Sequence, residues 1–478
     1  MGLVGAAFVG PCLGAAGGDS RPGSGNGAPE LGAGAVAGVY RGARLLGAAT
    51  YRTRGEPCFK GDLPCLELER GGGGRGHPGH GRPVMIDAID VHVTDLPVRL
   101  QRTFSSGSYD TGPSGQELGK PVLVKIHADG VTGYGQVRPI APGHFVADTT
   151  HSVVAAIRDI YGPALIGQQL CGLESMNAMF DRRLAGNPAA RAVLEMAVID
   201  AMGKACGVPA HTFLGGPCRT RIPLEWSVSL AGDVGAIVAE ATMAAEQYGI
   251  GILCIKGGDH RGWRQDVRHI EAVRRALGDS IVVGIDPNTG WTVPDALQAV
   301  DALRTIGIAY IEQPVDRRDL AGLAEIRQVA RGIPVMADES LFTLQDALAL
   351  ASARAVDAYC IKLYKVGGFT TARKMAAIAE AANLLVNCGG LAVQSQLEAA
   401  AAAHFCAGVR PDRFFGGAEF TFGLNTVAPD PLVVETDFVI RDGNVEVPTS
   451  AGLGVTIDEA ALRRYTLRLE HIGRETRR

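Results

Sequence analysis

Two lysines and three acidic residues stand at matching places in the sequence, each at the end of a short apolar segment. They are Lys256 in CIKGG, Asp286 in GIDPN, Glu312 in YIEQP, Asp338 in MADES and Lys362 in IKLYK. Carboxylate oxygens are the ligands that Mg²⁺ prefers, and a buried lysine beside such a cation can have its pKa lowered enough to act as a general base. The residues therefore predict removal of a proton next to a substrate carboxylate, with Mg²⁺ stabilising the resulting enolate.

These residues belong to a series of eight β-rich apolar segments, each followed by an amphipathic helical stretch. The polar positions that end the segments lie 24 to 32 residues apart. They are Trp226, Lys256, Asp286, Glu312, Asp338, Lys362, Asn387 and Glu419. Each interval holds one strand and one helix, which is typical of a (β/α)8-type barrel. We therefore expect all eight side chains at one mouth of a modified TIM barrel.

Three consecutive strands are expected to bring Asp286, Glu312 and Asp338 into one small volume. Their mutual repulsion favours a divalent cation between them, and salt bridges to lysine or arginine across the rim are the alternative. Asn288, two residues after Asp286, can orient the ligands or a water molecule. Glu339 is expected to point away from Asp338 and to pair with a lysine behind the metal ligands.

The second and sixth strands are opposite each other in a ring of eight, so Lys256 and Lys362 are expected on the two sides of a substrate. The alternative is that either lysine only balances the charge of the acids. Lys365 is expected to point elsewhere, in a structural role. Glu419 is a further catalytic candidate, as an acid or a hydrogen-bond partner, or else a residue of the rim.

The chain is expected to contain an α/β barrel and an α+β capping domain formed from N-terminal and C-terminal segments. Residues 1–84 contain 23 of the 64 glycines, which predicts a disordered extension without a secretory signal. Residues 85–215 are expected to form the cap and residues 216–432 the barrel. Residues 433–478 are expected to return to the cap.

The composition limits the partners. The chain has 478 residues with 46 Lys and Arg against 50 Asp and Glu, a net charge of −4. So weak a charge argues against nucleic acid and against an anionic membrane surface as partners. The ten cysteines include no CxxC pair, which is unlike a zinc ribbon or a disulfide framework. We expect a cytoplasmic protein that acts on a small carboxylate.

Five motifs resemble, in order, the barrel motifs of the enolase superfamily, in its muconate-lactonising-enzyme subgroup. They are CIKGG, GIDPNTGW, YIEQP, MADES and IKLYKVGG. The resemblance extends over about residues 85–465. It implies that Asp286, Glu312 and Asp338 bind Mg²⁺ or Mn²⁺ and that Lys256 and Lys362 are an acid/base pair. It also implies a loop over the substrate around residues 103–115 and a homo-oligomer, often an octamer.

Glu419 in GAEF is similar to the eighth-strand glutamate of muconate cycloisomerases. The first candidate reaction is therefore cycloisomerisation of a muconate-like diacid. Racemisation or epimerisation of an N-acylamino acid, and dehydration, are alternatives within the superfamily. From other classes, Lys362 could form a Schiff base in an aldolase, although this leaves the three acids unexplained, or the barrel could be non-catalytic.

The chain also departs from the family pattern. Cys254 stands where the subgroup usually has the first lysine of a Lys-X-Lys pair, so Lys256 lacks a neighbouring cation. Asn387 and Cys388 stand at the seventh strand, where the mandelate-racemase branch has a histidine, and this disfavours that branch. Both cysteines are expected to be small buried packing residues.

Overall fold

The computed structural model describes residues 83–97, 100–110, 119–140, 147–390, 395–434 and 436–473. All of them belong to Asp62–Arg478, the second of two compact units into which the chain divides. The predicted extension over residues 1–84 therefore lies outside the described residues, except for its last two. Of these, Val84 is buried and its carbonyl oxygen accepts a hydrogen bond from the Leu170 amide, so it already belongs to the fold.

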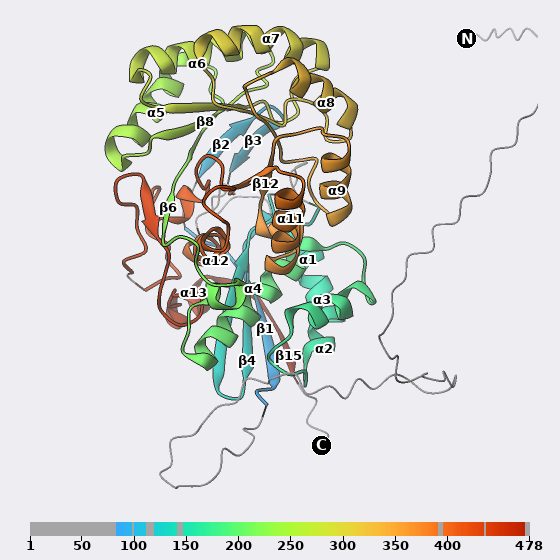
Figure 1. Ribbon diagram of the computed structural model, residues 1–478. Helices are drawn as coiled ribbons and strands as arrows, with labels where there is room; N and C mark the ends of the chain where they lie inside the picture. Colours follow the sequence, from blue (N-terminus) through green and yellow to red (C-terminus); the bar gives the residue numbers. More distant parts are fainter. Residues whose placement is uncertain are drawn as a thin grey trace, which may run out of the picture. The chain divides into compact units, whose positions relative to one another are not determined.

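Seven short parallel strands form one curled sheet in which each strand pairs with the next along the chain (Figure 1). They are β7 (Trp226–Val228), β8 (Ile252–Lys256), β9 (Val282–Asp286), β10 (Ile311–Glu312), β11 (Val335–Ala337), β12 (Ala358–Ile361) and β13 (Leu385–Cys388). The strands are paired in phase, so that Lys256 lies beside Asp286 at the carboxyl ends of β8 and β9. Residues at these ends share one mouth of the barrel.

The eighth predicted strand is a chain segment with two isolated bridges rather than a regular strand. Phe414 bridges to Val386 of β13, and Ala418 bridges to Leu224 just before β7, both in parallel. The segment thereby connects the two edges of the seven-stranded sheet. Gly417 permits this, because a Cβ atom there would lie 2.6 Å from the Leu224 backbone. The predicted barrel fold is confirmed, with this irregular segment in the eighth place.

Helices follow the barrel strands in alternation. They are α5 (Val234–Tyr248), α6 (Trp263–Leu277), α7 (Val293–Ile306), α8 (Leu320–Val329), α9 (Leu344–Ser352), α10 (Leu363–Val366), α11 (Phe369–Ala381) and α12 (Gln396–Ala407). Sequence signals set several ends. Thr292 and Asp295 form a capping box at the start of α7, and Gly307 in the left-handed region ends that helix.

The barrel interior below the mouth is filled by a separate cluster of buried residues. It consists of Cys254, Tyr310, Met336, Ala358 and Cys360. Gly284 on β9 makes room for the ring of Tyr310, since a Cβ atom at Gly284 would lie 2.0 Å from a ring carbon. The interior is therefore a packed core, and the polar side chains at the mouth rest on it.

The cap contains a four-stranded antiparallel sheet in the order β15-β1-β4-β5. Its strands are β1 (Ile86–Thr94), β4 (Val122–Ala128), β5 (Val131–Val137) and β15 (Thr466–Gly473). Ile472 pairs with Ile89, so the C-terminal strand completes a sheet that begins near the N-terminal end of the described chain. Gly133 and Gly135 of β5 allow close packing of a long helix, since Cβ atoms there would lie 2.1 and 2.2 Å from its carbonyl oxygens.

The other elements of the cap and the connections are short apart from that helix. They are α1 (Thr150–Ala156), the π-helix η2 (Ile157–Tyr161), α2 (Gly162–Leu165), α3 (Leu173–Asp181), the long α4 (Pro188–Cys206), η3 (Ala210–Leu214), β6 (Arg221–Pro223), η4 (Thr421–Gly423), β14 (Asn444–Glu446) and α13 (Glu459–Tyr465). Strands β6 and β14 pair with each other.

A small hairpin of the cap lies against the barrel mouth. It is formed by β2 (Gln101–Phe104) and β3 (Gly107–Asp110). The Thr103 amide donates to the Ser229 hydroxyl over 2.8 Å, and the Ser105 hydroxyl donates to the Asn288 carbonyl oxygen over 2.8 Å. These contacts place the described part of the predicted covering loop over the carboxyl ends of β7 and β9.

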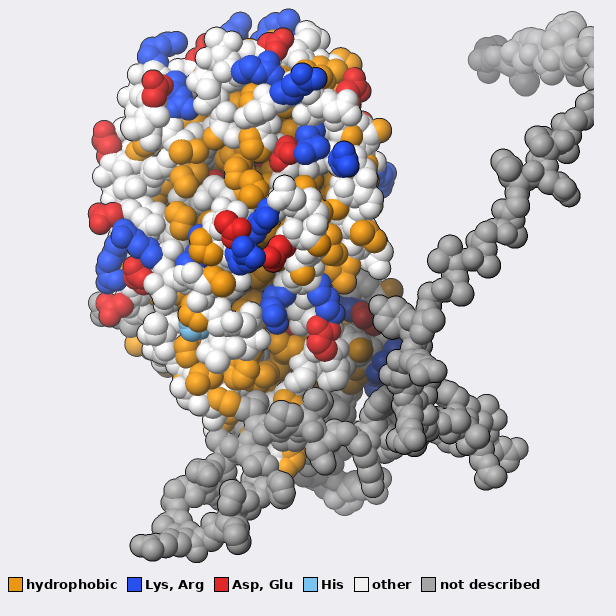
Figure 2. Space-filling view, viewed as in Figure 1, with side chains coloured by type: hydrophobic (Ala, Val, Ile, Leu, Met, Phe, Trp, Pro, Cys, Tyr) orange, Lys and Arg blue, Asp and Glu red, His pale blue; other side chains and the backbone are white. Residues whose placement is uncertain are grey.

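The surface is mixed in charge, and the described helices are not of the kind that spans a membrane. Figure 2 shows basic and acidic side chains mixed across the visible face. Within the described part of the chain, every helix is too short or too polar to cross a bilayer.

Candidate active site

Lys256 ends β8 and lies between two carboxylates. Its Nζ donates to Oδ2 of Asp286 over 2.6 Å and to Oε1 of Glu419 over 3.4 Å. The three side chains come from β8, β9 and the irregular segment, so barrel closure brings Glu419 next to β8. All three are buried.

The three predicted metal ligands lie next to one another around Glu312. Oxygens of Asp286 and Glu312 lie within 4.8 Å of each other and of the Cys254 sulfur, and oxygens of Glu312 and Asp338 lie within the same distance of each other. Among the described residues, no donor reaches Oε1 of Glu312, which is shielded from solvent. A buried carboxylate oxygen without a donor is costly, and a divalent cation would remove that cost. The oxygen donor set fits a hard divalent cation.

The pKa values follow this crowding of acids. Burial raises the pKa of Asp286 to about 7, although the ammonium group of Lys256 works in the opposite direction. Burial raises the pKa of Glu312 well above its ordinary value, and the charges of Asp286 and Asp338 add to this effect. The crowding therefore opposes ionisation of the carboxyl groups at the centre of the cluster.

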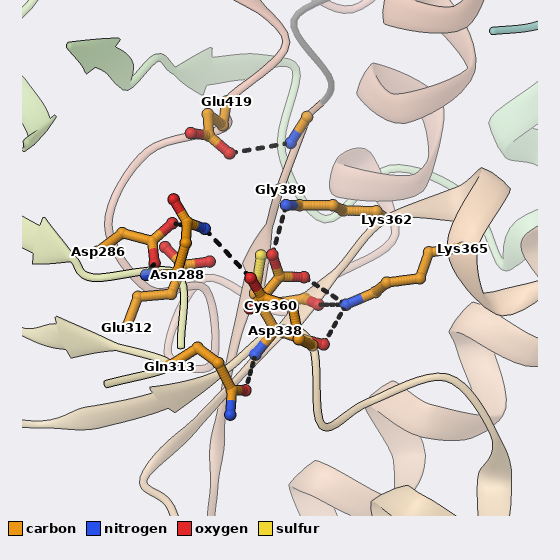
Figure 3. Close-up of polar contacts among 12 residues, drawn as sticks. Asp286, Asn288, Glu312, Gln313, Asp338, Cys360, Lys362, Lys365, Gly389 and Glu419 are labelled. Atoms are coloured by element: carbon orange, nitrogen blue, oxygen red, sulfur yellow. Dashed lines mark hydrogen bonds and ion pairs between the residues drawn. The ribbon is translucent and has the colours of Figure 1, made fainter. Parts of the chain in front are cut away.

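Asp338 differs because two lysines contact it (Figure 3). Nζ of Lys362 donates to Oδ2 over 2.6 Å, and Nζ of Lys365 donates to Oδ1 and to the Asp338 carbonyl oxygen. Burial opposes ionisation, but the two ammonium groups outweigh it and lower the pKa of Asp338. The expectation that Lys365 points elsewhere is wrong.

The pKa values of the two candidate bases move in the direction opposite to the predicted one. Burial lowers the pKa of Lys256, but the charges of Asp286 and Glu419 outweigh burial and raise it well above its ordinary value. The pKa of Lys362 is raised in the same way by Asp338. The carboxylates favour the ammonium forms, and a cation that binds the same carboxylates competes with this effect.

Asn288 orients the first acid of the cluster. Its backbone amide donates to Oδ1 of Asp286 over 2.8 Å and its side-chain amide to Oδ2 over 2.7 Å. The side-chain amide also donates to Oε1 of Glu339 over 3.2 Å. The structure thus joins Glu339 to the cluster through Asn288.

Sequence reasoning placed the wrong residue of the first strand at the mouth. Trp226 begins β7 instead of ending it, and its Nε1 donates to Oε1 of Glu240 on α5 over 2.9 Å. Ser227, the next residue, faces the opposite side and lines the cavity at the mouth. The alternation of a strand was the signal that could have identified Ser227.

Two further polar residues at the site were not predicted. Oε1 of Gln313 accepts hydrogen bonds from the amides of Asp338 and Ser340, both over 3.0 Å, and so fixes the turn after β11. Glu225 lies within 4.8 Å of the Cys254 sulfur and of Glu419. Burial and the charge of Glu419 raise the pKa of Glu225 to about 8. The position of Gln313 directly after Glu312 could have identified it as a residue of the site.

One cavity brings the two lysines together. It is lined by Phe104 and Ile140 of the cap and by Ser227, Lys256, Asn288, Lys362, Tyr364, Gly390, Glu419 and Phe422 of the barrel domain. Oε2 of Glu419 accepts a hydrogen bond from the Gly390 amide over 3.3 Å. Asn387 lies outside this group, since its amide donates to the carbonyl oxygens of Phe415 and Gly417. Both candidate bases therefore line the same cavity.

Comparisons with known proteins agree with this geometry. Residues 236–461 match the family "Enolase C-terminal domain-like", and residues 114–215 match the "Mandelate racemase / muconate lactonizing enzyme, N-terminal domain". A chloromuconate cycloisomerase of Cupriavidus necator is 30% identical over 80% of this chain and 99% of its own length. A hydrophobic dipeptide epimerase of Enterococcus faecalis is 31% identical over 77% of this chain and 98% of its own.

Solved structures give the same result. A muconate lactonizing enzyme from Pseudomonas fluorescens, in complex with muconolactone, has a TM-score of 0.73 and 28% identity, covering 80% of this chain and all of that one. An N-succinyl Arg/Lys racemase from Bacillus cereus has a TM-score of 0.72 and 29% identity, covering 81% of this chain and all of that one. The chain belongs to the enolase superfamily, in the subgroup of the muconate lactonizing enzymes.

Proposed function

We propose that this chain is a metal-dependent isomerase that moves a proton on the carbon next to a carboxylate of a small substrate. The observation that carries the proposal is one cavity containing two lysines on opposite strands, each hydrogen-bonded to a carboxylate of the acidic cluster. Such an arrangement supports proton removal and return at a carbon between the two amines.

Asp286, Glu312 and Asp338 are the residues that would hold Mg²⁺ or Mn²⁺. When bound, the cation supplies positive charge that stabilises the negative charge developing on the substrate carboxylate. Oε1 of Glu312 has no donor among the described residues, and this fact and the raised pKa of the group support a cation at this place.

The chain's own residues account for the rest of the reaction. Nζ of Lys256 and Nζ of Lys362 exchange a proton with the substrate carbon. Glu419 positions Lys256 through a 3.4 Å contact between Oε1 and Nζ, and Phe104 of the cap lies with its ring centre 5.8 Å from the same Nζ. The apolar ring and the hairpin that carries it help to exclude water from the amine.

Two reactions are candidates for this proton transfer. Cycloisomerisation of a muconate-like diacid is supported by Glu419 in the cavity and by the similarity to muconate and chloromuconate cycloisomerases. Racemisation or epimerisation of an amino-acid derivative is supported by the two lysines, since one can remove the proton and the other can return it on the opposite face. Epimerase and racemase relatives agree with this second candidate.

Deuterium exchange in D₂O, followed by NMR, tests the proposed function. With Mg²⁺ present, we expect exchange of the hydrogen next to the carboxylate in a panel of muconolactones and N-acylamino acids. We expect EDTA to abolish the exchange and Asp286→Asn to weaken Mg²⁺ binding in calorimetry. Asp301→Asn is the matched control, because Asp301 is an exposed residue of α7. Exchange that survives EDTA, or borohydride trapping of a substrate imine on Lys362, would contradict the proposal.

We also propose that the protein acts as a homo-oligomer, often an octamer in this family, in a reducing cytoplasm. All seven cysteines among the described residues are free, which supports a reducing environment. Light scattering coupled to size-exclusion chromatography measures the oligomeric state. A monomer at micromolar concentration would contradict this part of the proposal.

A further inference from the structure

Glu398 is an acid of the barrel domain that the proposed mechanism does not use. It lies in the first turn of α12, where its backbone amide donates to the Ser395 hydroxyl that caps the helix. Oε2 of Glu398 is shielded from solvent and receives no hydrogen bond from the described residues. Burial raises the pKa of Glu398 to about 8, although the charge of Arg138 works against this rise.

Glu398 lines a second cavity, which adjoins the active-site cavity at Lys362. Its other walls include the apolar side chains of Leu363, Ala402 and Phe420. Lys362 and Tyr364 line this cavity and also the active-site cavity with Lys256 and Glu419. The two cavities therefore adjoin each other at these shared residues, and Glu398 is the acid that lines the second cavity.

The buried carboxyl group of Glu398 would be stabilised by a hydrogen-bond donor from a ligand. A carboxyl oxygen that is hidden from water and has no donor destabilises the fold, and a ligand that brings an N–H group removes this penalty. An ammonium group is the strongest such donor, because the hydrogen bond is then charge-assisted. A second carboxylate of the substrate is a poor match, since two adjacent carboxylates repel each other unless they share a proton.

A helix-stabilising role does not account for this side chain. Acidic residues in a first helical turn interact favourably with the helix dipole when they lie at the surface. Glu398 instead lies against a cavity wall, where desolvation opposes its charge. No capping box joins its carboxyl group to Ser395, and the amides at the start of α12 are satisfied by the Ser395 hydroxyl and the Asp430 carboxylate.

We propose that the substrate carries an ammonium or other N–H group at the end remote from its reacting carbon, and that the carboxylate of Glu398 binds this group in the cavity beyond Lys362. The inference rests on the proposed function. Between its two candidate reactions, it favours racemisation or epimerisation of an amino-acid derivative over cycloisomerisation of a diacid.

Three N-acetylamino acids test the far-end group by Mg²⁺-dependent deuterium exchange. N-acetyl-lysine ends in an ammonium group, N-acetyl-2-aminoadipate ends in a carboxylate at similar length, and N-acetylalanine has no far-end group. We expect kcat/KM at least about tenfold higher for the lysine derivative than for the aminoadipate derivative. We expect Glu398→Gln to lower the lysine value about tenfold or more, and to leave the alanine value within about twofold.

Two further variants complete the design. Glu380→Gln removes an exposed glutamate that pairs with Arg410, and it is expected to leave all three values unchanged. Glu398→Asp keeps the charge on a shorter side chain and is expected to retain part of the preference for lysine. Thermal melting of each variant separates a loss of fold from a loss of recognition.

The outcomes separate the inference from the function on which it rests. Loss of the aminoadipate activity alone in Glu398→Gln would mean that Glu398 donates a proton to a second carboxylate, and it would overturn the inference. Equal effects on all three compounds would overturn it too. EDTA-sensitive exchange of a muconolactone, with none of the acetylated amino acids exchanging, would overturn the inference and leave the proposed function intact. No exchange with any carboxylate would overturn both.

Discussion

The two lysine-bearing sides of the active site have opposite balances of charge. We call them the β8 arm (Lys256, Asp286 and Glu419) and the β12 arm (Lys362, Lys365 and Asp338). In the β8 arm one ammonium group contacts two carboxylates. In the β12 arm two ammonium groups contact one carboxylate. Two amines that look equivalent in the sequence therefore work in different surroundings.

The difference indicates what each lysine does besides chemistry. Loss of the Lys256 ammonium leaves two buried carboxylates without a cation. Loss of the Lys362 ammonium leaves Asp338 with Lys365, which also donates to two backbone carbonyl oxygens, those of Asp338 and Cys360. In the proposed mechanism Lys256 would thus combine proton transfer with the compensation of two carboxylates, whereas Lys362 shares the compensation of Asp338 with Lys365.

The largest expected effect comes from removing either amine. Lys256→Met and Lys362→Met should each lower deuterium exchange by about a thousandfold, because a positioned general acid or base contributes roughly 10² to 10⁴. Magnesium affinity, measured by calorimetry, should remain in both variants.

The same pair of variants tests the comparison through stability. Without added Mg²⁺, Lys256→Met should lower the free energy of unfolding by about 3 kcal/mol, because it breaks a buried ion pair. Lys362→Met should cost less than about 1 kcal/mol, since Lys365 still compensates Asp338. Urea denaturation measures both. Equal losses of unfolding free energy in the two variants would show that the buried carboxylates of the two arms depend equally on these lysines.

Lys365→Met should have the next largest effect, mainly on stability. The change removes a buried ammonium group that contacts the Asp338 carboxylate and two carbonyl oxygens, at a cost of about 3 kcal/mol. The double variant with Lys362→Met should cost more than the sum of the single variants, by at least about 1 kcal/mol. If the losses of unfolding free energy were additive in urea denaturation, the two lysines would not depend on each other through the Asp338 carboxylate.

Glu225→Gln tests the excess of acids on the β8 side. Glu225 lies within 4.8 Å of Glu419, and burial and that charge raise its pKa from 4.5 to about 8 in the folded chain. The folded state therefore holds this proton more tightly than the unfolded state does. The free energy of unfolding should fall as the pH rises from about 5 to 8, by up to about 1.4 kcal/mol per pH unit.

The variant has no proton to lose at this position. Glu225→Gln should be about as stable as the parent chain at pH 5 and more stable at pH 8, by roughly 2 kcal/mol or more. Denaturation curves at the two pH values measure the difference. Parallel pH dependence in the two proteins would mean that Glu225 titrates normally.

The regular spacing of strand ends was enough to predict which side chains meet at the mouth of the barrel. Strand and helix alternate with short connections, so Asp286, Glu312 and Asp338 had to reach one mouth together with Lys256 and Lys362. Spacing alone was not enough at β7. A shift of one residue in a strand exchanges its faces, which is why Ser227 rather than Trp226 lines the cavity.

Two other residues were misjudged or overlooked for local reasons. Lys365 was expected to point elsewhere, but the chain turns directly into α10 after Lys362, and residues three apart share a side of a helix. Glu398 looks like any acid in a first helical turn, and its sequence neighbours do not reveal that it lines a cavity. Tertiary packing, which one sequence does not display, decides both cases.

Cys254→Ala is expected to have the smallest effect on stability and exchange. It tests whether the Cys254 thiol belongs to the β8 arm. Cys254 is fully buried, and its sulfur lies 3.9 Å from Oε2 of Glu312. If Cys254 only fills space where the subgroup usually has a lysine, the variant should lose about 1 kcal/mol of stability and keep exchange within about threefold. Cys388→Ala, which removes another buried thiol at the end of β13, is the matched control.

A different outcome would change the account of the β8 arm. A hundredfold loss of exchange in Cys254→Ala, with none in Cys388→Ala, would mean that the thiol takes part in the chemistry beside Lys256. Small and equal effects would instead mean that one lysine, held between Asp286 and Glu419, serves this arm without help from its neighbour on the strand. In that case the acids, rather than a second amine, set the behaviour of Lys256.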